Sequence, residues 1–248
     1  MIDRRLAQVK NVILVMSGKG GVGKSVVSAT LAALLSEAGH SVGLLDADIY
    51  GPSAALLLGT RSRPDEGSRG LIPPRVRGIS VMSVDLFAPG EPVPLTGTAA
   101  VQVITEMLAL TYWGPLDFLI VDMPPATSDI MMLLTALKPR RLAAIVVSMP
   151  DNLSLTVARR VLELLRSGGI PVLGVLGNMV GRDSGDEGGP GKLAGEFHAR
   201  FLGNLPYDAE VRKAADKGST EILLQTRFAH ALKRSMGQSS EPLGPALS

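Results

Sequence analysis

The sequence predicts an α/β fold in which helices cover both faces of a doubly wound, mainly parallel sheet. Three observations lead to this prediction. Short apolar runs alternate with stretches of helical character along most of the chain, which is the pattern of repeated strand and helix units. Hydrophobic residues make up 46% of the chain and charged residues 19%, a balance that fits a sheet buried on both sides. The length of 248 residues suits one such domain better than two domains and a linker.

A first strand–helix–strand unit is predicted close to the start of the chain. Val12–Met16 is short, rich in β-branched residues and followed by glycines, as expected of a buried strand. Ser25–Ala38 has helical character and is closed by Gly39. Ser41–Asp46 follows immediately as a second strand. The unit should therefore be parallel and right-handed.

The same alternation continues along the rest of the chain. Further strands are predicted at Ile79–Val84, Phe118–Val121, Ala143–Ser148 and Val172–Leu176. Helices are predicted at Ala99–Leu110, Asp129–Leu137 and Leu153–Arg166. Loops are expected at Thr60–Gly78 and Gly181–Gly191, where glycine, proline and polar residues gather. We expect one domain over residues 1–236 and a flexible C-terminal tail over residues 237–248.

Composition excludes several kinds of chemistry. The chain has no cysteine, so it offers no disulfide, thiolate nucleophile or thiolate metal ligand. Its net charge is only +2, and acidic residues dilute the arginines of the Thr60–Gly78 loop, so we expect no nucleic-acid partner. The first ten residues lack the apolar stretch of a signal peptide, and no run of about 18 apolar residues follows. We expect a cytoplasmic protein with no stable membrane anchor.

A phosphate-binding loop is predicted at Gly18–Ser25, which reads GKGGVGKS and matches the P-loop pattern between a predicted strand and a predicted helix. Unpaired amides at the helix start can bind phosphate oxygens, and glycines let the backbone approach closely. Lys24 would place its charge on the β and γ phosphates of ATP, while the Ser25 hydroxyl would ligate Mg²⁺. A dinucleotide-binding loop is the weaker alternative, because it leaves this lysine and serine unexplained. The residues expected to bind ATP here are Gly18, Lys19, Gly20, Gly21, Val22, Gly23, Lys24 and Ser25.

Three aspartates that end predicted strands are candidates for metal and water chemistry. Asp122 ends the run FLIVDMPP, and Mg²⁺ coordination is favoured over capping of the following helix. Asp46 and Asp48 close the strand in LLDADIYGPS; Asp48 is the candidate to position the attacking water, and Asp46 should lie nearer the metal. One of these two can instead satisfy turn amides. We therefore expect Ser25, Asp46 and Asp122 at the metal, and Lys24 and Asp48 as catalytic residues.

Asn178 ends the strand VLGVLGNM and is a candidate for base recognition. Its amide offers both a donor and an acceptor, which suits the edge of adenine. A polar turn residue is an equally good interpretation of the same pattern. The three histidines show no metal-ligand spacing, and the methionines are expected in the core.

Together these motifs resemble the Mrp/ApbC family of P-loop ATPases, relatives of MinD and of nitrogenase iron protein, over nearly all of the chain. GKGGVGKS is similar to the family's deviant Walker A motif, DADIYGPS to its first switch, VDMPPATSD to its second, and GNM, GGPGKLA and LPYDAEVRKAADKG to later segments. The resemblance implies a homodimer that binds ATP and Mg²⁺ and hydrolyses ATP slowly. It also implies that Lys19 is the signature lysine that reaches the ATP of the partner chain, which would make it catalytic, and that Asn178 contacts adenine.

The family is associated with carrying iron–sulfur clusters on a CxxC pair that lies shortly after the NM segment. Here that place reads VGRDSGDEGGPGK, in which Asp183, Asp186 and Glu187 are hard oxygen donors that suit such a cluster poorly. We therefore expect no iron–sulfur cluster on this chain alone, and an unidentified client protein, with an iron–sulfur protein as one candidate.

Two other functions stay open at this point. One is a non-hydrolysing scaffold in which bound ATP merely holds the dimer closed. The other is a MinD- or ParA-like positioning ATPase that acts on membranes. The C-terminal stretch QSSEPLGPALS lacks the basic, amphipathic pattern that interfacial helices need, which argues against the second.

Overall fold

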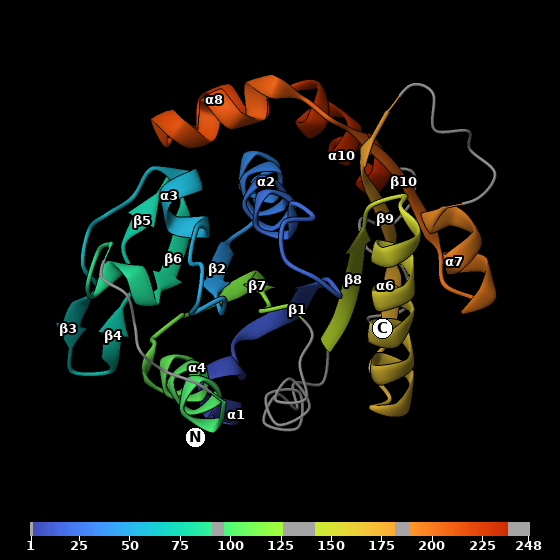
Figure 1. Ribbon diagram of the computed structural model, residues 1–248. Coiled ribbons are helices and arrows are strands. Elements are labelled where there is room, and N and C mark those ends of the chain that lie inside the picture. Colours follow the sequence, from blue (N-terminus) through green and yellow to red (C-terminus); the bar gives the residue numbers. More distant parts are fainter. Residues whose placement is uncertain (1, 91–96, 126–141, 182–188, 238–248) are drawn as a thin grey trace.

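The computed structural model describes residues 2–90, 97–125, 142–181 and 189–237. Within these ranges the main sheet has eight strands in the order β10-β9-β8-β1-β7-β2-β6-β5 (Figure 1). Neighbouring strands run parallel, except that β5 is antiparallel to β6. These strands are β1 (Val9–Met16), β2 (Val42–Asp46), β5 (Arg75–Val76), β6 (Ile79–Ser83), β7 (Leu116–Asp122), β8 (Leu142–Ser148), β9 (Val172–Val180) and β10 (Phe201–Pro206).

Helices cover both faces of this sheet, so the predicted doubly wound fold is confirmed. Side chains alternate along β1: Val12, Leu14 and Met16 join the core under α1, α4, α6 and α7, whereas Ile13 and Val15 join the core under α2, α3 and α10. None of the helices in the described ranges is long and apolar enough to span a bilayer. The helices are α1 (Ile2–Leu6), α2 (Lys24–Glu37), α3 (Ala54–Leu58), the 3₁₀ helix η1 (Val84–Leu86), α4 (Thr98–Leu110), α6 (Asn152–Ser167), α7 (Pro190–Glu196), α8 (Ala209–Lys217), α9 (Thr220–Leu224) and α10 (Arg227–Gly237).

Most predicted elements that fall in the described ranges are present, with different ends. The first strand begins at Val9 instead of Val12, and the last predicted strand continues to Val180 instead of ending at Leu176. The predicted helix Asp129–Leu137 lies outside the described residues, as does most of the predicted loop Gly181–Gly191. The end of that predicted loop was assigned wrongly, because Pro190 begins α7.

The arginine-rich segment Thr60–Gly78, expected to be a loop, contains regular structure. It forms the hairpin β3 (Asp65–Gly67) and β4 (Gly70–Ile72), and then the short strand β5. The partners of this hairpin come from a distant part of the chain: the amide of Tyr112 donates to the carbonyl of Leu71 at 2.7 Å. Local composition alone does not reveal such contacts, which explains the error.

Candidate functional site

The turn between β1 and α2 needs glycine for two different reasons. Gly21 and Gly23 have φ angles of 79° and 83°, in the left-handed region that favours glycine. A Cβ atom on Gly18 would lie 2.4 Å from the backbone of Val157 in α6, so a larger residue does not fit there. In the part of the chain that the structure describes, α2 begins at Lys24 without a side-chain cap. Its first amides are therefore available to an anion held in this turn.

Lys24 lies in a buried cluster of charges at the start of α2. Its side chain is only 5% exposed, and its Nζ lies 2.8 Å from Asp122 Oδ1, 3.6 Å from Asp48 Oδ2 and 3.5 Å from Ser25 Oγ. Asp122 Oδ1 also accepts a hydrogen bond from the Ser28 hydroxyl, at 2.8 Å. Among the described residues, the buried Oδ2 of Asp122 has no hydrogen-bond partner. The cluster thus holds a paired lysine charge and one carboxylate oxygen that is still able to accept.

Asp46 lies beside Asp122 on the neighbouring strand and is completely buried. Its carboxylate accepts hydrogen bonds from the backbone amides of Asp48 at 3.1 Å, Ser53 at 2.8 Å and Ala54 at 2.9 Å. Burial, and then the negative charge of Asp122, raise the pKa of Asp46 from 3.8 to about 7. Asp46 therefore holds turn amides, the alternative that the sequence left open, and its contact with the metal stays a prediction.

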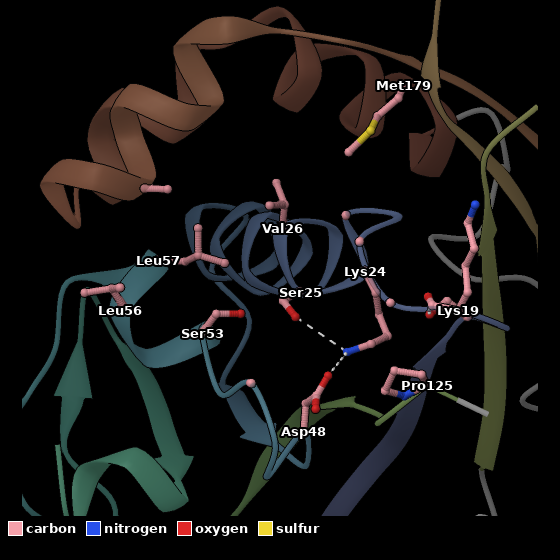
Figure 2. A pocket seen from close by; sticks show the side chains of 16 residues that line it. Lys19, Lys24, Ser25, Val26, Asp48, Ser53, Leu56, Leu57, Pro125 and Met179 are labelled. Carbon is pink, nitrogen blue, oxygen red and sulfur yellow. Dashed lines mark hydrogen bonds and ion pairs between the residues drawn. The ribbon is translucent and has the colours of Figure 1, made fainter. Parts of the chain in front are cut away.

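Lys19 points away from Lys24 (Figure 2). Its Nζ lies 3.5 Å from Asp151 Oδ1, and both side chains are partly exposed, at 31% and 44%. Asp151 caps α6 by accepting a hydrogen bond from the amide of Ser154. The hydrogen bonds with Ser154 are the main cause that lowers the pKa of Asp151, and the positive charge of Lys19 lowers it as well. An exposed pair of this kind stabilises by at most about 1 kcal/mol, so Lys19 can leave Asp151 easily.

Asn178, at the end of β9, contacts the turn itself. Its Nδ2 donates to the carbonyl of Val22 at 2.7 Å, and a Cβ atom on Gly23 would lie 2.3 Å from this nitrogen. The Oδ1 atom of Asn178 is buried and has no partner among the described residues. The amide thus braces the turn with its donor and keeps its acceptor available.

A cavity of about 500 Å³ joins these groups. Lys24, Ser25 and Asp48 face it together with Ser53, as Figure 2 shows. The remaining lining residues are Ser17, Lys19, Gly20, Gly21, Gly23, Val26, Gly51, Leu56, Leu57, Pro125, Met179 and Ala215. Asp46, Asp122 and Asn178 do not line the cavity; they lie in the layer behind its lining. The size and the mixture of polar and apolar walls suit a ligand as large as a nucleotide.

Part of the apolar wall comes from α3 and α8, which touch through two glycines. Gly59 ends α3 with a φ of 78°, and a Cβ atom there would lie 2.1 Å from the carbonyl oxygen of Gly218, which follows α8. The buried hydroxyl of Thr220 donates to the carbonyl of Leu58 at 3.1 Å. The position of α3 against the cavity is therefore fixed from its far end.

Comparison with known protein families shows which family this chain belongs to. A family model described as NUBPL iron-transfer P-loop NTPase, of the ParA type, matches residues 8–238. The chain belongs to this family. The predicted resemblance to the Mrp/ApbC-type, MinD-like P-loop ATPases is confirmed by this match.

Individual members of the NUBPL iron-transfer family are similar over most of this chain. The iron-sulfur cluster carrier protein of Methanocaldococcus jannaschii is 34% identical over 94% of this chain and 85% of its own length. That of Aquifex aeolicus is 37% identical over 89% of this chain and 64% of its own length. The bovine cytosolic Fe-S cluster assembly factor NUBP2 is 38% identical over 86% of this chain and 85% of its own length. This chain therefore spans slightly less than two thirds of the Aquifex protein and most of the other two.

Solved structures agree with this assignment. A nucleotide-binding protein from Archaeoglobus fulgidus, in complex with ADP and with cobalt present, is 32% identical, with a TM-score of 0.75 over 89% of this chain and 91% of that one. The cell division ATPase MinD of Pyrococcus furiosus has a TM-score of 0.70 at 22% identity, over 92% and 97% of the two chains, which shows a shared fold.

The groups around the cavity fit Mg²⁺ bound together with a nucleotide. Their oxygens come from the hydroxyl of Ser25 and the carboxylates of Asp48 and Asp122, which are the hard donors that Mg²⁺ prefers. The unpartnered Oδ2 of Asp122 is the acceptor that such an ion, or a water bound to it, would use. In the described ranges no group of three or more acidic or histidine side chains would hold a metal by itself. Mg²⁺ carried on phosphates matches this incomplete set of protein ligands.

The sequence did not reveal every residue that shapes the site. Asp208 accepts hydrogen bonds from the amides of Glu210, Arg227 and Phe228, and so joins the starts of α8, which carries the lining residue Ala215, and α10. An aspartate directly before a helical stretch is a signal for a cap, and it predicts only the first of these contacts. The partners in α10 are 19 and 20 residues away, and no local pattern indicates them.

Proposed function

We propose that this member of the NUBPL iron-transfer family is an ATP-binding and ATP-hydrolysing dimeric switch that acts in the assembly or transfer of iron–sulfur clusters, with the cluster thiolates supplied by another protein. The observation that carries the proposal is the meeting of Lys24, Ser25 and Asp48 at one cavity, with Asp46 and Asp122 buried behind it. The similarity to an archaeal protein in complex with ADP supports a nucleotide in this cavity. We also propose that residues 1–236 form one ATPase domain, followed by a tail over residues 237–248.

In this proposal the turn binds the phosphates of ATP. The amides of residues Gly18–Ser25 donate to phosphate oxygens, and Lys24 gives up its loose contact with Asp48, 3.6 Å long, for a phosphate. Ser25 and Asp122 hold Mg²⁺, directly or through water, and Asn178 contacts adenine. When bound, Mg²⁺ neutralises phosphate charge. Asp48, with a side chain 15% exposed at the cavity, is then free to orient the attacking water.

Lys19 provides the link between hydrolysis and dimer formation. In one chain it is paired with Asp151, and a weak, partly exposed pair can be replaced by a stronger one. We propose that Lys19 leaves Asp151 when two chains close on two ATP molecules, and that it then contacts the ATP of the partner. A second cation on the transferring phosphoryl group stabilises the charge that develops there, so hydrolysis depends on the dimer.

The cargo and the client follow from the family and from the composition together. Similar proteins are named as iron-sulfur cluster carriers and as a cluster assembly factor. This chain has no cysteine, so a cluster handled by it needs thiolates from a client protein. Anaerobic reconstitution with iron and sulfide tests this point: a stable four-iron absorption spectrum from this chain alone would show that the chain has cluster ligands of its own and would contradict the proposal.

The main test is phosphate release with Mg²⁺ and ATP by the wild-type chain and by the variants Lys24→Ala and Asp48→Ala. We expect slow release by the wild-type chain and loss of release in both variants. Lys10→Ala is the matched control, because Lys10 forms an exposed ion pair with Asp117 and does not line the cavity. Undiminished release by both site variants would remove the mechanism.

The same experiments separate the two alternative functions. Nucleotide binding with no phosphate release above background would favour the non-hydrolysing scaffold. Sedimentation with liposomes in the presence of ATP would favour the MinD- or ParA-like positioning factor. Light scattering with and without ATP measures the dimer directly, and the Asp48→Ala variant, which should stay closed, is the bait for the client in a pull-down.

A further inference from the structure

Ser53 begins α3, but its hydroxyl is not used to cap that helix. In the described structure its side chain makes no hydrogen bond to a backbone amide of α3. Other helices of this chain start differently. The Ser219 side chain accepts a hydrogen bond from the amide of Ile222 at the start of α9, and the Asp151 side chain accepts one from the amide of Ser154 at the start of α6. Serine is favoured at such positions because its oxygen replaces a missing backbone partner. The Ser53 hydroxyl therefore does not have the role that serine usually has at the start of a helix.

Asp46 holds the backbone at the start of α3 from the side of the sheet. One oxygen of its carboxylate accepts from the amides of both Ser53 and Ala54, at 2.8 and 2.9 Å. They belong to the cap residue itself and to the first residue of the helix, so Asp46 holds the start of α3 in place. The buried carboxylate also fixes the backbone of Ser53 from behind, so the direction of the hydroxyl is set by a rigid support.

The hydroxyl instead points into the cavity. Ser53 lines it opposite the P-loop, next to Asp48, and Figure 2 shows its oxygen directed toward the space that Ser25 and the Lys24 ammonium also face. The P-loop thus supplies one hydroxyl, from Ser25, and the segment after β2 supplies a second one. A hydroxyl can donate to a phosphate oxygen or ligate Mg²⁺ through its own oxygen.

We propose that the Ser53 hydroxyl contacts the terminal phosphate of ATP or the Mg²⁺ bound to it, and that this contact distinguishes ATP from ADP. The inference rests on the proposed function and assigns the site one more residue. The P-loop holds the phosphates that ATP and ADP share, whereas Ser53 stands with Asp48 on the wall where the attacking water is needed. Because Ser53 is the first residue before α3, the contact stabilises α3 only when the terminal phosphate is present.

The test compares Ser53→Ala with the wild-type chain by calorimetry, using Mg²⁺ with a non-hydrolysable ATP analogue and, separately, Mg²⁺ with ADP. We expect the variant to bind the analogue about ten-fold or more weakly, the range for a lost hydrogen bond to a charged group. Its affinity for ADP should stay within about two-fold of the wild type. Ser53→Thr keeps the hydroxyl and should bind both nucleotides as the wild type does.

Two results would overturn the inference. One is an equal effect of Ser53→Ala on both nucleotides, or none on either. The other is a fall in thermal stability as large as that caused by Ser219→Ala, which removes a hydroxyl that does cap a helix. Failure of the wild-type chain to bind either nucleotide is a different outcome, because it would reject the proposed function itself.

Discussion

The buried carboxylate of Asp46 should make the folded protein less stable as the pH rises toward 8. Burial, and then the neighbouring charge of Asp122, raise the pKa of Asp46 from 3.8 to about 7. The folded state therefore binds a proton more tightly than the unfolded state does. Protonation of Asp46 stabilises the folded state below pH 3.8, and this contribution is lost progressively as the pH rises to about 7.

The size of the effect follows from the same two values. Each pH unit between them changes the free energy of unfolding by about 1.4 kcal/mol per group, so a rise from pH 5 to pH 8 should remove about 2 to 3 kcal/mol. The pKa of Asp117 is shifted in the opposite direction, far below its usual value, by its bonds with Lys10 and Ser41. Asp117 therefore titrates only in acid and does not contribute between pH 5 and pH 8.

Urea unfolding followed by circular dichroism at pH 5, 6.5 and 8, in buffer without nucleotide or Mg²⁺, measures this dependence. The fall in stability should nearly disappear in Asp46→Asn, which has no group to titrate. Asp117→Asn is the matched control, and its stability should fall in parallel with that of the wild type. A wild-type stability that stays constant or rises over this range, or a parallel fall in Asp46→Asn, would refute the reasoning.

Three further predictions concern one residue of the cavity lining and two residues that fix helices α3, α8 and α10. Gly59→Ala should destabilise the fold by about 1 to 3 kcal/mol more than Gly39→Ala in thermal unfolding. Both glycines have a positive φ, but only the Cβ atom added at Gly59 would meet the backbone, at Gly218. Equal losses of stability would contradict this close contact. Asp208→Ala should cost about 2 to 4 kcal/mol in urea unfolding, since two helix starts lose their cap, and a loss under about 0.5 kcal/mol would show that these caps do not matter. Lys24→Ala should prevent the dimer that light scattering detects with ATP, and a dimer of unchanged amount would argue against ATP-dependent closure.

Local patterns were sufficient to predict the first strand–helix–strand unit and the residues that meet at the cavity. Buried strands of a parallel sheet are continuous apolar runs, so β1 and β2 could be recognised from a few neighbouring residues. Because parallel strands end at the same edge of the sheet, polar residues that follow them come together. This rule predicts that Lys24, Asp48 and Asp122 lie near one another, and the ion pairs of Lys24 with both aspartates agree with it.

Features that depend on distant partners could not be predicted in this way. The hairpin β3–β4 is held by a contact with Tyr112, about forty residues away, and its own sequence has the composition of a loop. The sequence also does not show which of Asp46 and Asp48 binds the amides of the turn after β2. In the structure it is Asp46, because the turn folds back over its buried carboxylate. Ser53 ends the segment DADIYGPS, and no local pattern indicates that its side chain faces the cavity.

Calorimetric titration of the wild-type chain with ATP in the presence of Mg²⁺ tests the central claim most directly, because the claim is that the turn at Gly18–Ser25 and the Lys24 ammonium receive a triphosphate. The account predicts one ATP bound per chain, with affinity at least about a hundred-fold weaker in Lys24→Ala, as expected when a phosphate loses its buried, positively charged partner. Absence of any heat of binding for the wild type, or equal affinity in the two proteins, would contradict it.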